Sequence, residues 1–423
     1  MAGAVEIYSS EMAGATAMIL MTSQSTLTRP TMASGDLLIE TISPDELTAP
    51  DHAAWDELFE AQPGPANPFC APEWVLGWYS VFTAAEDQLL FLIRSGDHLV
   101  GVAPFFRSRV RVGGATLLGR LQLAGAGQGG SLLELPQVLA APGFERAVLR
   151  LVVAETMLNK ELTGSGLWGE IQIPRSQGWF EPEWAARTGH PVSFQRHVGS
   201  QACVMLPLSG SWEATKSGLK RNVKESLRRS RNRLAKDGRP WSVQRRTRDI
   251  DAAVVDRFLG LHQQRAEQKV ANRHGDAFAD PARRQFLRSV LPALGSQGRA
   301  SILELTLGGE VVASQLMLHA PQLTYIHSSG FRADVWDLGP VTFLQGMAIS
   351  DAADRGEDWI NLSPGPNVAK LRWSEQVDVH DDFSYGSGNR WLYLRYAAFS
   401  IAQTLSQVGH AVRVNRQALE PQH

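Results

Sequence analysis

The chain has 423 residues, and its 41 lysine and arginine residues nearly balance its 43 aspartate and glutamate residues. At about 100–200 residues per domain, this length predicts two or three domains. Apolar residues make up 43% and charged residues 20%, which is typical of a globular protein with a sizeable core. The near-zero net charge excludes a general attraction to polyanions, so an anionic partner would require a local basic patch. The two cysteines, Cys70 and Cys203, offer neither a disulfide framework nor a zinc site and fit a reducing cytoplasm.

The first 36 residues are rich in Ala, Ser, Thr, Gly and Met. Their short apolar stretch at 17–21 follows no positively charged start and falls far below the roughly 20 apolar residues that span a membrane. We expect a disordered leader over residues 1–36, no membrane span anywhere in the chain, and a cytoplasmic protein.

An internal repeat organises the rest of the chain. Both halves show a Phe-x-x-Pro segment, an amphipathic helical pattern, an apolar strand, a glycine-containing turn and a second strand. In the first half these segments are 69–72, 74–82, 89–93, 95–97 and 99–106; in the second half they are 278–281, 286–294, 300–305, 308–309 and 311–318. A glycine turn between apolar runs indicates a β-hairpin, and the repeated order indicates two copies of one unit.

The remaining periodicity completes an alternation of helices and strands. We expect helices at 144–158, 254–268 and 341–355, strands at 167–173, 203–208, 325–331 and 359–362, and a loop at 177–191. Such alternation predicts an α/β fold, with a mixed sheet of the α+β kind. The domain boundary is expected near residue 200, giving domains at 37–200 and 201–400 and a C-terminal helix or tail at 401–423.

Several short segments, in a specific order, carry a family resemblance that covers roughly residues 37–395. They are Asn67-Pro68-Phe69 with Pro72 and Trp74; Trp212; Lys220-Arg221-Asn222; the basic run 228–238; 261–265; Phe286-Leu287; Ser329-Gly330-Phe331; and Gly365, Lys370 and Trp373. Through them the chain resembles the GNAT superfamily of acyltransferases, in its CelD-like branch. It is more distantly similar to the Fem-type aminoacyltransferases, which carry two GNAT domains.

The resemblance implies an N-acyltransferase that moves an acyl group from an acyl-CoA-type thioester to a small-molecule amine. Such enzymes position two substrates and stabilise a tetrahedral oxyanion with backbone N–H groups. The resemblance also implies two tandem GNAT-like domains, of which the N-terminal one is degenerate and the C-terminal one carries the site.

Two departures from the family pattern keep other functions open. The loop that would hold the CoA pyrophosphate contains one glycine, Gly339, followed by Pro340, which lacks an amide donor. Asn361 stands where an Asp is common, and Ala369 where a Tyr usually precedes the lysine. The alternatives are a Fem-like aminoacyl-tRNA-dependent transferase acting on a small molecule or peptide, and a non-catalytic GNAT scaffold.

The segment from Lys216 to Arg239 contains the strongest charge signal in the sequence. Its cations are Lys220, Arg221, Lys224, Arg228, Arg229, Arg231, Arg233, Lys236 and Arg239. Like charges four residues apart destabilise an isolated helix, so a helix with this pattern often has an anionic partner. The segment, capped by Ser211 or Ser217, is therefore either a solvated face or a clamp for the phosphates of a donor or of tRNA. We expect Lys220, Arg221, Arg228, Arg229 and Gly339 to contact the donor.

The remaining candidates lie on the elements around the predicted strand at 325–331. His262 has the residue type of a base, Arg265 that of a carboxylate ligand, and Ser329 belongs to the strand that faces the reacting carbonyl in GNAT folds. The catalytic candidates are His262, Ser329, Asn361 and Lys370; the substrate-binding candidates are Arg265, His327, Ser328, Arg372 and Trp373. No metal-ligand spacing such as H-E-x-x-H occurs, so we expect no metal.

Overall fold

The computed structural model describes residues 37–112, 115–126, 132, 134–158, 168–174, 192–267 and 275–387, together with 394, 397, 398 and 401. The leader expected at 1–36, the loop expected at 177–191 and the segment 402–423 lie outside the described residues. All the described residues belong to one compact unit.

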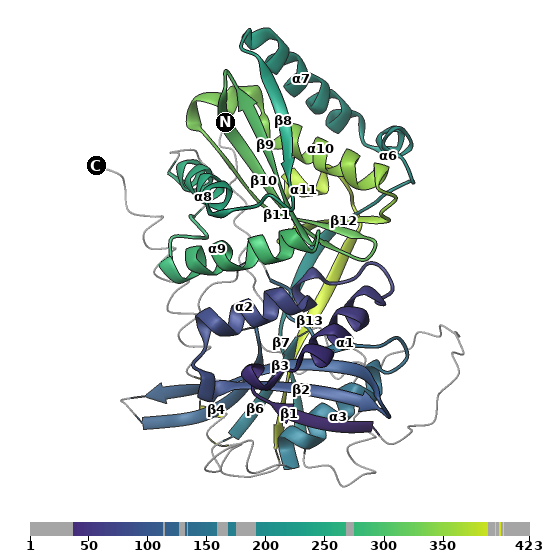
Figure 1. Cartoon of the computed structure of the whole chain (residues 1–423), viewed down its shortest axis with the longest axis vertical. Coiled ribbons are helices and arrows are strands. Elements are labelled where there is room, and N and C mark those ends of the chain that lie inside the picture. Colours follow the sequence, from purple (N-terminus) through teal and green to yellow (C-terminus); the bar gives the residue numbers. More distant parts are fainter. Residues whose placement is uncertain are drawn as a thin grey trace. The chain divides into compact units, whose positions relative to one another are not determined.

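One large mixed sheet runs through this unit, in the order β1-β2-β3-β4-β6-β13-β7-β12-β11-β10-β9-β8, with β5 paired to β3 (Figure 1). The strands of the first half of the chain are β1 (Leu37–Ile42), β2 (Gln88–Ser95), β3 (His98–Val112), β4 (Ala115–Leu123), β5 (Leu139–Ala140), β6 (Trp168–Pro174) and β7 (Val192–Pro207). Those of the second half are β8 (Trp241–Arg246), β9 (Ala300–Leu307), β10 (Glu310–Ala320), β11 (Leu323–Phe331), β12 (Trp359–Pro364) and β13 (Val377–Ser387).

The strand pairing confirms the tandem α/β architecture, because the order of antiparallel and parallel pairs is the same when followed from either edge of the sheet. The series β1–β4 and the series β8–β11 are each joined antiparallel, and each ends on a parallel pair, β4 with β6 and β11 with β12. Each parallel pair is then extended by an antiparallel strand from the other half: β13 pairs with β6, and β7 pairs with β12. The two halves have exchanged their last strands, and the β7–β13 pair joins them.

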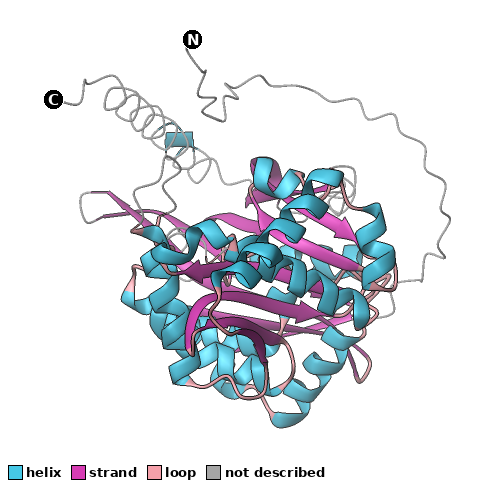
Figure 2. Cartoon of the chain, turned by 90° about the horizontal axis from the view of Figure 1, so that it is seen from above, coloured by secondary structure: helices cyan, strands magenta, loops and turns pink. Residues whose placement is uncertain are grey.

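The helices lie on both faces of this sheet (Figure 2). They are α1 (Ala49–Glu60), α2 (Pro72–Phe82), α3 (Glu145–Leu158), α6 (Trp212–Gly218), α7 (Arg221–Asp237), α8 (Ala252–Ala266), α9 (Pro281–Ser296), α10 (Pro340–Asp354) and the short α11 (Val368–Leu371). Four 3-10 turns are η1 (Pro44–Glu46), η2 (Pro68–Cys70), η3 (Ala85–Asp87) and η4 (Ala333–Leu338). The helix pairs α1–α2 and α8–α9 share one buried core that contains Trp55, Trp74, Phe258 and Phe286. On the other face, α3 and α10 each cover their own half.

Two sequence expectations are corrected in the segment that joins the halves. The strand expected from Cys203 begins at Val192, so residue 200, near which the boundary is predicted, lies inside β7. The basic segment forms two helices instead of one. Ser211 caps α6 through a hydrogen bond from the Ala214 amide, whereas α7 begins after Lys220 with no side-chain cap. Ser217 therefore does not cap the basic helix.

Candidate functional site

The parallel strands β11 and β12 separate in the middle of the second half. They pair only from Leu323 to Tyr325 on β11 and from Trp359 to Asn361 on β12. Beyond that point β12 continues on β7, and β11 continues on β10 with a register shift that leaves His327 opposite no residue. The backbone of β11 after Tyr325 thus has one edge that no described strand occupies. Unpaired strand groups of this kind can hydrogen-bond an extended ligand.

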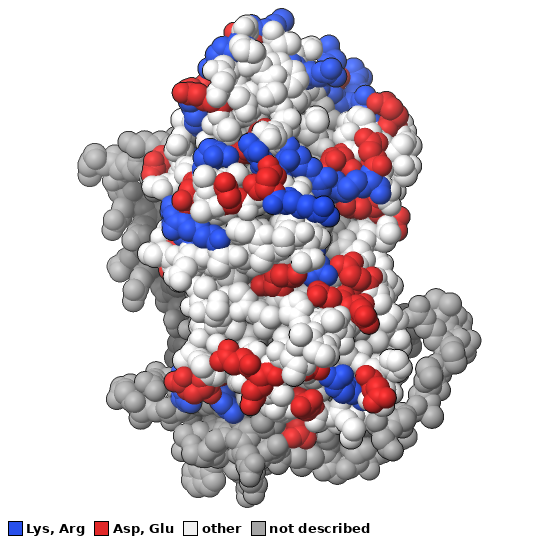
Figure 3. Space-filling model, viewed as in Figure 1, with Lys and Arg blue, Asp and Glu red and all other residues white. Residues whose placement is uncertain are grey.

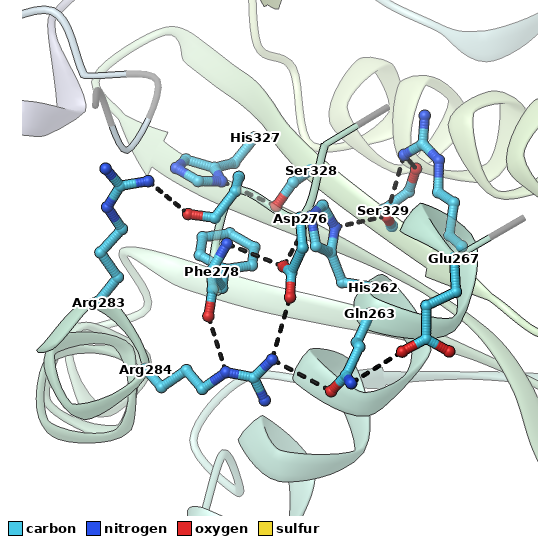
Figure 4. A network of polar contacts seen from close by, with 12 residues as sticks. His262, Gln263, Glu267, Asp276, Phe278, Arg283, Arg284, His327, Ser328 and Ser329 are labelled. Carbon is cyan, nitrogen blue, oxygen red and sulfur yellow. Dashed lines mark hydrogen bonds and ion pairs between the residues drawn. The ribbon is translucent and has the colours of Figure 1, made fainter. Parts of the chain in front are cut away.

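Helix α8 places two of the predicted residues on the carbonyl group of Ser329 (Figure 4). His262, which is buried, donates from Nδ1 over 3.1 Å, because a carbonyl oxygen can only accept. Arg265 donates from Nη1 to the same oxygen over 3.0 Å and to the Ser329 hydroxyl over 2.8 Å. The other ring nitrogen of His262 lies 3.8 Å from the Asp276 carboxylate. Burial lowers the pKa of Arg265.

His327 connects the two halves of the chain. Its Nε2 donates to the Leu132 carbonyl over 2.5 Å, and its Nδ1 lies 2.9 Å from the Ser328 hydroxyl, which therefore acts as the donor. The ring packs among Phe69, Trp74, Tyr325 and Phe278. Burial lowers the pKa of His327 to about 4, so the imidazole is neutral at physiological pH.

Lys370 binds the last residues of β12. Its ammonium group donates to the Ser363 carbonyl and hydroxyl over 3.1 Å each and to the Pro364 carbonyl over 2.6 Å. Ser363 has a positive φ of 66°, a conformation that is costly for a residue with a side chain. Burial lowers the pKa of Lys370 to about 8, and the nearby Cys203 thiol opposes that shift.

The two residues after α11 support this segment. Arg372 donates to the Thr342 hydroxyl at the start of α10 over 2.9 Å, and burial lowers its pKa. Trp373 is 2% exposed and packs in the core beneath α10. Asn361 is also buried, and its Oδ1 accepts a hydrogen bond from the Ser363 amide over 2.8 Å. Lys370, Asn361 and Ser363 therefore form one group at the point where β12 leaves β11.

The basic helix α7 lies against the start of α10. Gly339, with a φ of 69°, directly precedes α10, and a Cβ on it would lie 3.3 Å from the Ser230 hydroxyl of α7. Arg233 of α7 donates to the Asp337 carbonyl, two residues before Gly339, over 2.6 Å. The first amides of a helix have no intrahelical partner, so Val341 and Thr342 present amides there although Pro340 has none.

The predicted donor contacts on α7 differ in their surroundings. Lys220 pairs with Glu375 over 2.6 Å, and Arg221 pairs with Glu225 over 3.0 Å. Arg228 and Arg229 are exposed and form no salt bridge with a described residue. Figure 3 shows lysine and arginine side chains gathered over α7.

A small pocket opens beside Asn361, where the first half of the chain meets the second. The loop Pro65–Pro68 and Leu135 form one wall, and Met205, Leu323, Asn361, Asp378 and His380 form the other. Sequence reasoning missed Asp378 and His380, because β13 shows no local motif and its place beside β7 follows only from the exchange of strands. Among the described residues, no group of three His, Cys, Asp or Glu side chains has the arrangement of a metal site.

The comparisons with known proteins agree with this geometry. Residues 221–371 match the sequence model of the acetyltransferase (GNAT) domain. The crystal structure of FemX is similar over 82% of this chain and 97% of its own, with 10% identity and a TM-score of 0.55. This likeness shows the fold, and it spans both halves of the chain. No curated protein matches the sequence.

Other solved structures are similar at lower scores. The C-terminal domain of a putative lysylphosphatidylglycerol synthetase from Agrobacterium fabrum has 12% identity, covers 84% of this chain and 96% of its own, and gives a TM-score of 0.46. A tandem GNAT protein from the clavulanic acid biosynthesis pathway has 13% identity, covers 84% and 99%, and gives a TM-score of 0.41. Among the described residues no helix is long and apolar enough to cross a membrane.

Proposed function

We propose that this chain, of which residues 221–371 match the acetyltransferase (GNAT) domain, transfers an acyl group from a CoA-type thioester to a small-molecule amine in the cytoplasm. The single observation that carries the proposal is the separation of β11 from β12. An extended thioester arm fits along the unpaired edge of β11, with its carbonyl beside the bulge at His327. The GNAT domain supports acyl or aminoacyl transfer in general; CoA as the donor carrier and an amine as the acceptor are parts of the proposal.

The surroundings of Gly339 support a phosphate-bearing donor. A diphosphate at the start of α10 would meet helix amides and the basic side chains of α7, of which Arg233 already reaches η4. Lys220 and Arg221, being paired with glutamates, would contact the donor only after exchanging those partners.

The residues around the bulge would act on the acyl group and the acceptor. In this proposal the backbone of Ser328 and Ser329 positions the thioester. His262 and Arg265 hold the Ser329 carbonyl in place through their hydrogen bonds. His327 keeps the first half of the chain against this strand. Lys370, protonated below its pKa of about 8, would give a proton to the leaving thiolate. Asn361 would hold β12 in position through Ser363, while Arg372 and Trp373 hold the Lys370 segment.

Thermal unfolding with ligands tests the donor. A donor present at about a hundred times its Kd stabilises the fold by roughly 2.7 kcal/mol, which shifts the midpoint measurably. We expect acetyl-CoA and CoA to raise the midpoint, and Gly339→Trp, which places a ring against Ser230, to abolish the shift. A shift with charged tRNA alone would refute the CoA assignment.

A second candidate donor is aminoacyl-tRNA, and the observation in its favour is the exposed arginine pair of α7. Arg228 and Arg229 have no acidic partner among the described residues and would suit an RNA backbone. For this donor, the double substitution Arg228→Glu and Arg229→Glu should abolish activity, and binding should weaken steeply with salt. For a CoA donor the same variant should keep most of its activity.

A further inference from the structure

The face of the sheet that carries α3 and α10 has a wide stretch between these two helices. Helix α3 packs on β1, β3 and β5, and α10 packs on β9 to β12. Between β3 and β12 the sheet continues through β4, β6, β13 and β7 (Figure 1). Neighbouring strands lie about 4.8 Å apart, so β3 and β12 are about 24 Å apart along the sheet. This distance leaves room for one more helix, about 10 Å wide, beside α3 and α10.

Two valines of β13 lie exposed in this stretch. Val377 stands opposite Val204 of β7, and Val379 stands opposite Ala202, so the four side chains point to one face of the sheet. Val204 belongs to the buried core under α10, which shows which face it is. Val377 is nevertheless 41% exposed, and Val379 is 51% exposed. An apolar sheet face is stable when another element covers it, so these valines mark a place where a covering element would pack.

The sequence after β13 has an apolar stripe at helical spacing. The stripe runs through residues 391–408, here called the apolar segment, at Trp391, Leu394, Ala398, Ile401, Leu405 and Val408. Steps of three and four residues are typical of the face that a helix packs on a sheet. Leu394 and Ile401, two turns apart, are helical, and they are 58% and 62% exposed. Gly409 follows the stripe, and glycine commonly ends a helix.

The connection between β13 and the apolar segment fits a return over the same strand. Ser387 ends β13, and the linker is Gly388-Asn389-Arg390, in which the Gly-Asn pair favours a reversal of the chain. A helix from Trp391 reaches Leu405 after about 21 Å. Val379 lies about 26 Å back along β13 from Ser387, so the two positions agree to within one helical turn. So short a linker also gives the segment a millimolar effective concentration, which favours it over a second molecule.

We propose that residues 391–408 form a helix whose apolar stripe packs on Val377 and Val379, between α3 and α10. The occupant of this face is the apolar segment of the same chain. This inference goes beyond the proposed acyl transfer and depends on neither its donor nor its acceptor. Because β13 joins the two halves by pairing with β6 and β7, the docked helix fastens the strand that holds the halves together.

Maleimide labelling of single introduced cysteines in the full chain tests whether the stripe is covered. Cys70 and Cys203 are buried, so the introduced thiol gives the signal. Ile401→Cys should react at least tenfold more slowly than Gln403→Cys, its matched control on the opposite side of the helix. Adding Val379→Asp should bring the two rates to within twofold, whereas adding Leu38→Asp, at an exposed residue of the edge strand β1, should leave them apart. Equal rates for the two cysteines without any further change would overturn the proposal.

A second substitution and a cross-link identify the occupant. Leu394→Asp, on the segment itself, should speed the labelling of Ile401→Cys as Val379→Asp does, so the result does not depend on how β13 tolerates a charge. A short bismaleimide should link Val379→Cys to Leu405→Cys within one molecule and should not link Leu38→Cys to Leu405→Cys. Cross-linked dimers, or protection of Ile401→Cys that dilution removes, would make a second copy the occupant and refute the proposal. Protection that Val379→Asp leaves unchanged would place the stripe on another surface and refute it as well.

Discussion

Lys370 binds the end of β12, next to the separation of β11 and β12, and as the proposed proton donor it should set the pH dependence of the reaction. Its pKa is lowered to about 8 by burial, and the proposed proton donation requires the charged form. We expect kcat to fall above about pH 8. Lys370→Met should lower kcat by a factor of about 10²–10⁴. Lys370→Arg stays charged, so its kcat should no longer fall at alkaline pH. An unchanged alkaline limb in Lys370→Arg would assign that limb to another group.

Glu134 couples the stability of the fold to pH. It accepts a hydrogen bond from Trp74 over 2.9 Å, and burial raises its pKa from 4.5 to about 7. The folded protein thus holds this proton more tightly than the unfolded chain does. The stabilisation is complete below about pH 4.5 and is lost as the pH rises through 7, by roughly 3 kcal/mol. Glu134→Gln keeps an acceptor for Trp74, and urea unfolding between pH 5 and 8 should show a flatter dependence than the wild type.

At the scale of elements, the contact of α8 with β11 depends on a single glycine. A Cβ on Gly330 would lie 2.4 Å from the backbone nitrogen of His262 and 2.6 Å from the Leu261 carbonyl carbon, and backbone atoms cannot move aside. We expect Gly330→Ala to destabilise the protein by several kcal/mol, or to move α8 and with it His262 and Arg265.

Gly260→Ala is the matched control for that substitution. Gly260 lies on α8, the helix that packs against β11 at Gly330, and its Cβ would meet no atom within 4 Å. Because alanine favours helix over glycine by about 1 kcal/mol, chemical denaturation should show equal or greater stability. Destabilisation by both substitutions would mean that the close approach at Gly330 is not the cause.

The elements also show what the sequence can and cannot predict. The hairpins at Gly96 and at Gly308-Gly309 were predictable, because positive φ at these glycines matches the turn between two apolar runs. Strand β13 was not, because its polar sequence acquires its meaning only beside β6 and β7. The residues of the candidate site likewise divide into those that local sequence patterns reveal and those that they do not. His262, Arg265 and Ser329 were each named from the sequence, and the structure brings them into contact, whereas Asp378 and His380 depend on a pairing that no local pattern encodes.

At the scale of the whole unit, Arg299 joins the two halves. It lies just before β9 and binds Asp56 over 2.7 Å, Glu60 over 2.8 Å and Glu73 over 2.9 Å, all from α1 and α2. Its side chain is 9% exposed; burial acts to lower its pKa, but the three carboxylates outweigh this and raise the pKa above its usual value. Removing one partner of a buried charge network costs about 3–5 kcal/mol. Arg299→Met should lower stability by that amount in denaturant unfolding.

Arg288→Met is the control for the loss of a charge. Its pair with Asp256 is half exposed, and such pairs contribute about 0–1 kcal/mol. If both variants unfold at the same denaturant concentration, Arg299 does not hold the halves together.

The exchange of β7 and β13 has a consequence for biosynthesis. A division near residue 200 stays our prediction for the two domains, yet β6 receives its outer neighbour, β13, only from residues 377–387. During translation, the first half therefore leaves the ribosome with an open sheet edge and keeps it until residues 377–387 have been made. Open edges invite pairing with other chains. The nascent first half is thus the stage at which this protein most needs a chaperone, and premature termination before residue 377 should yield an aggregating fragment instead of a stable domain.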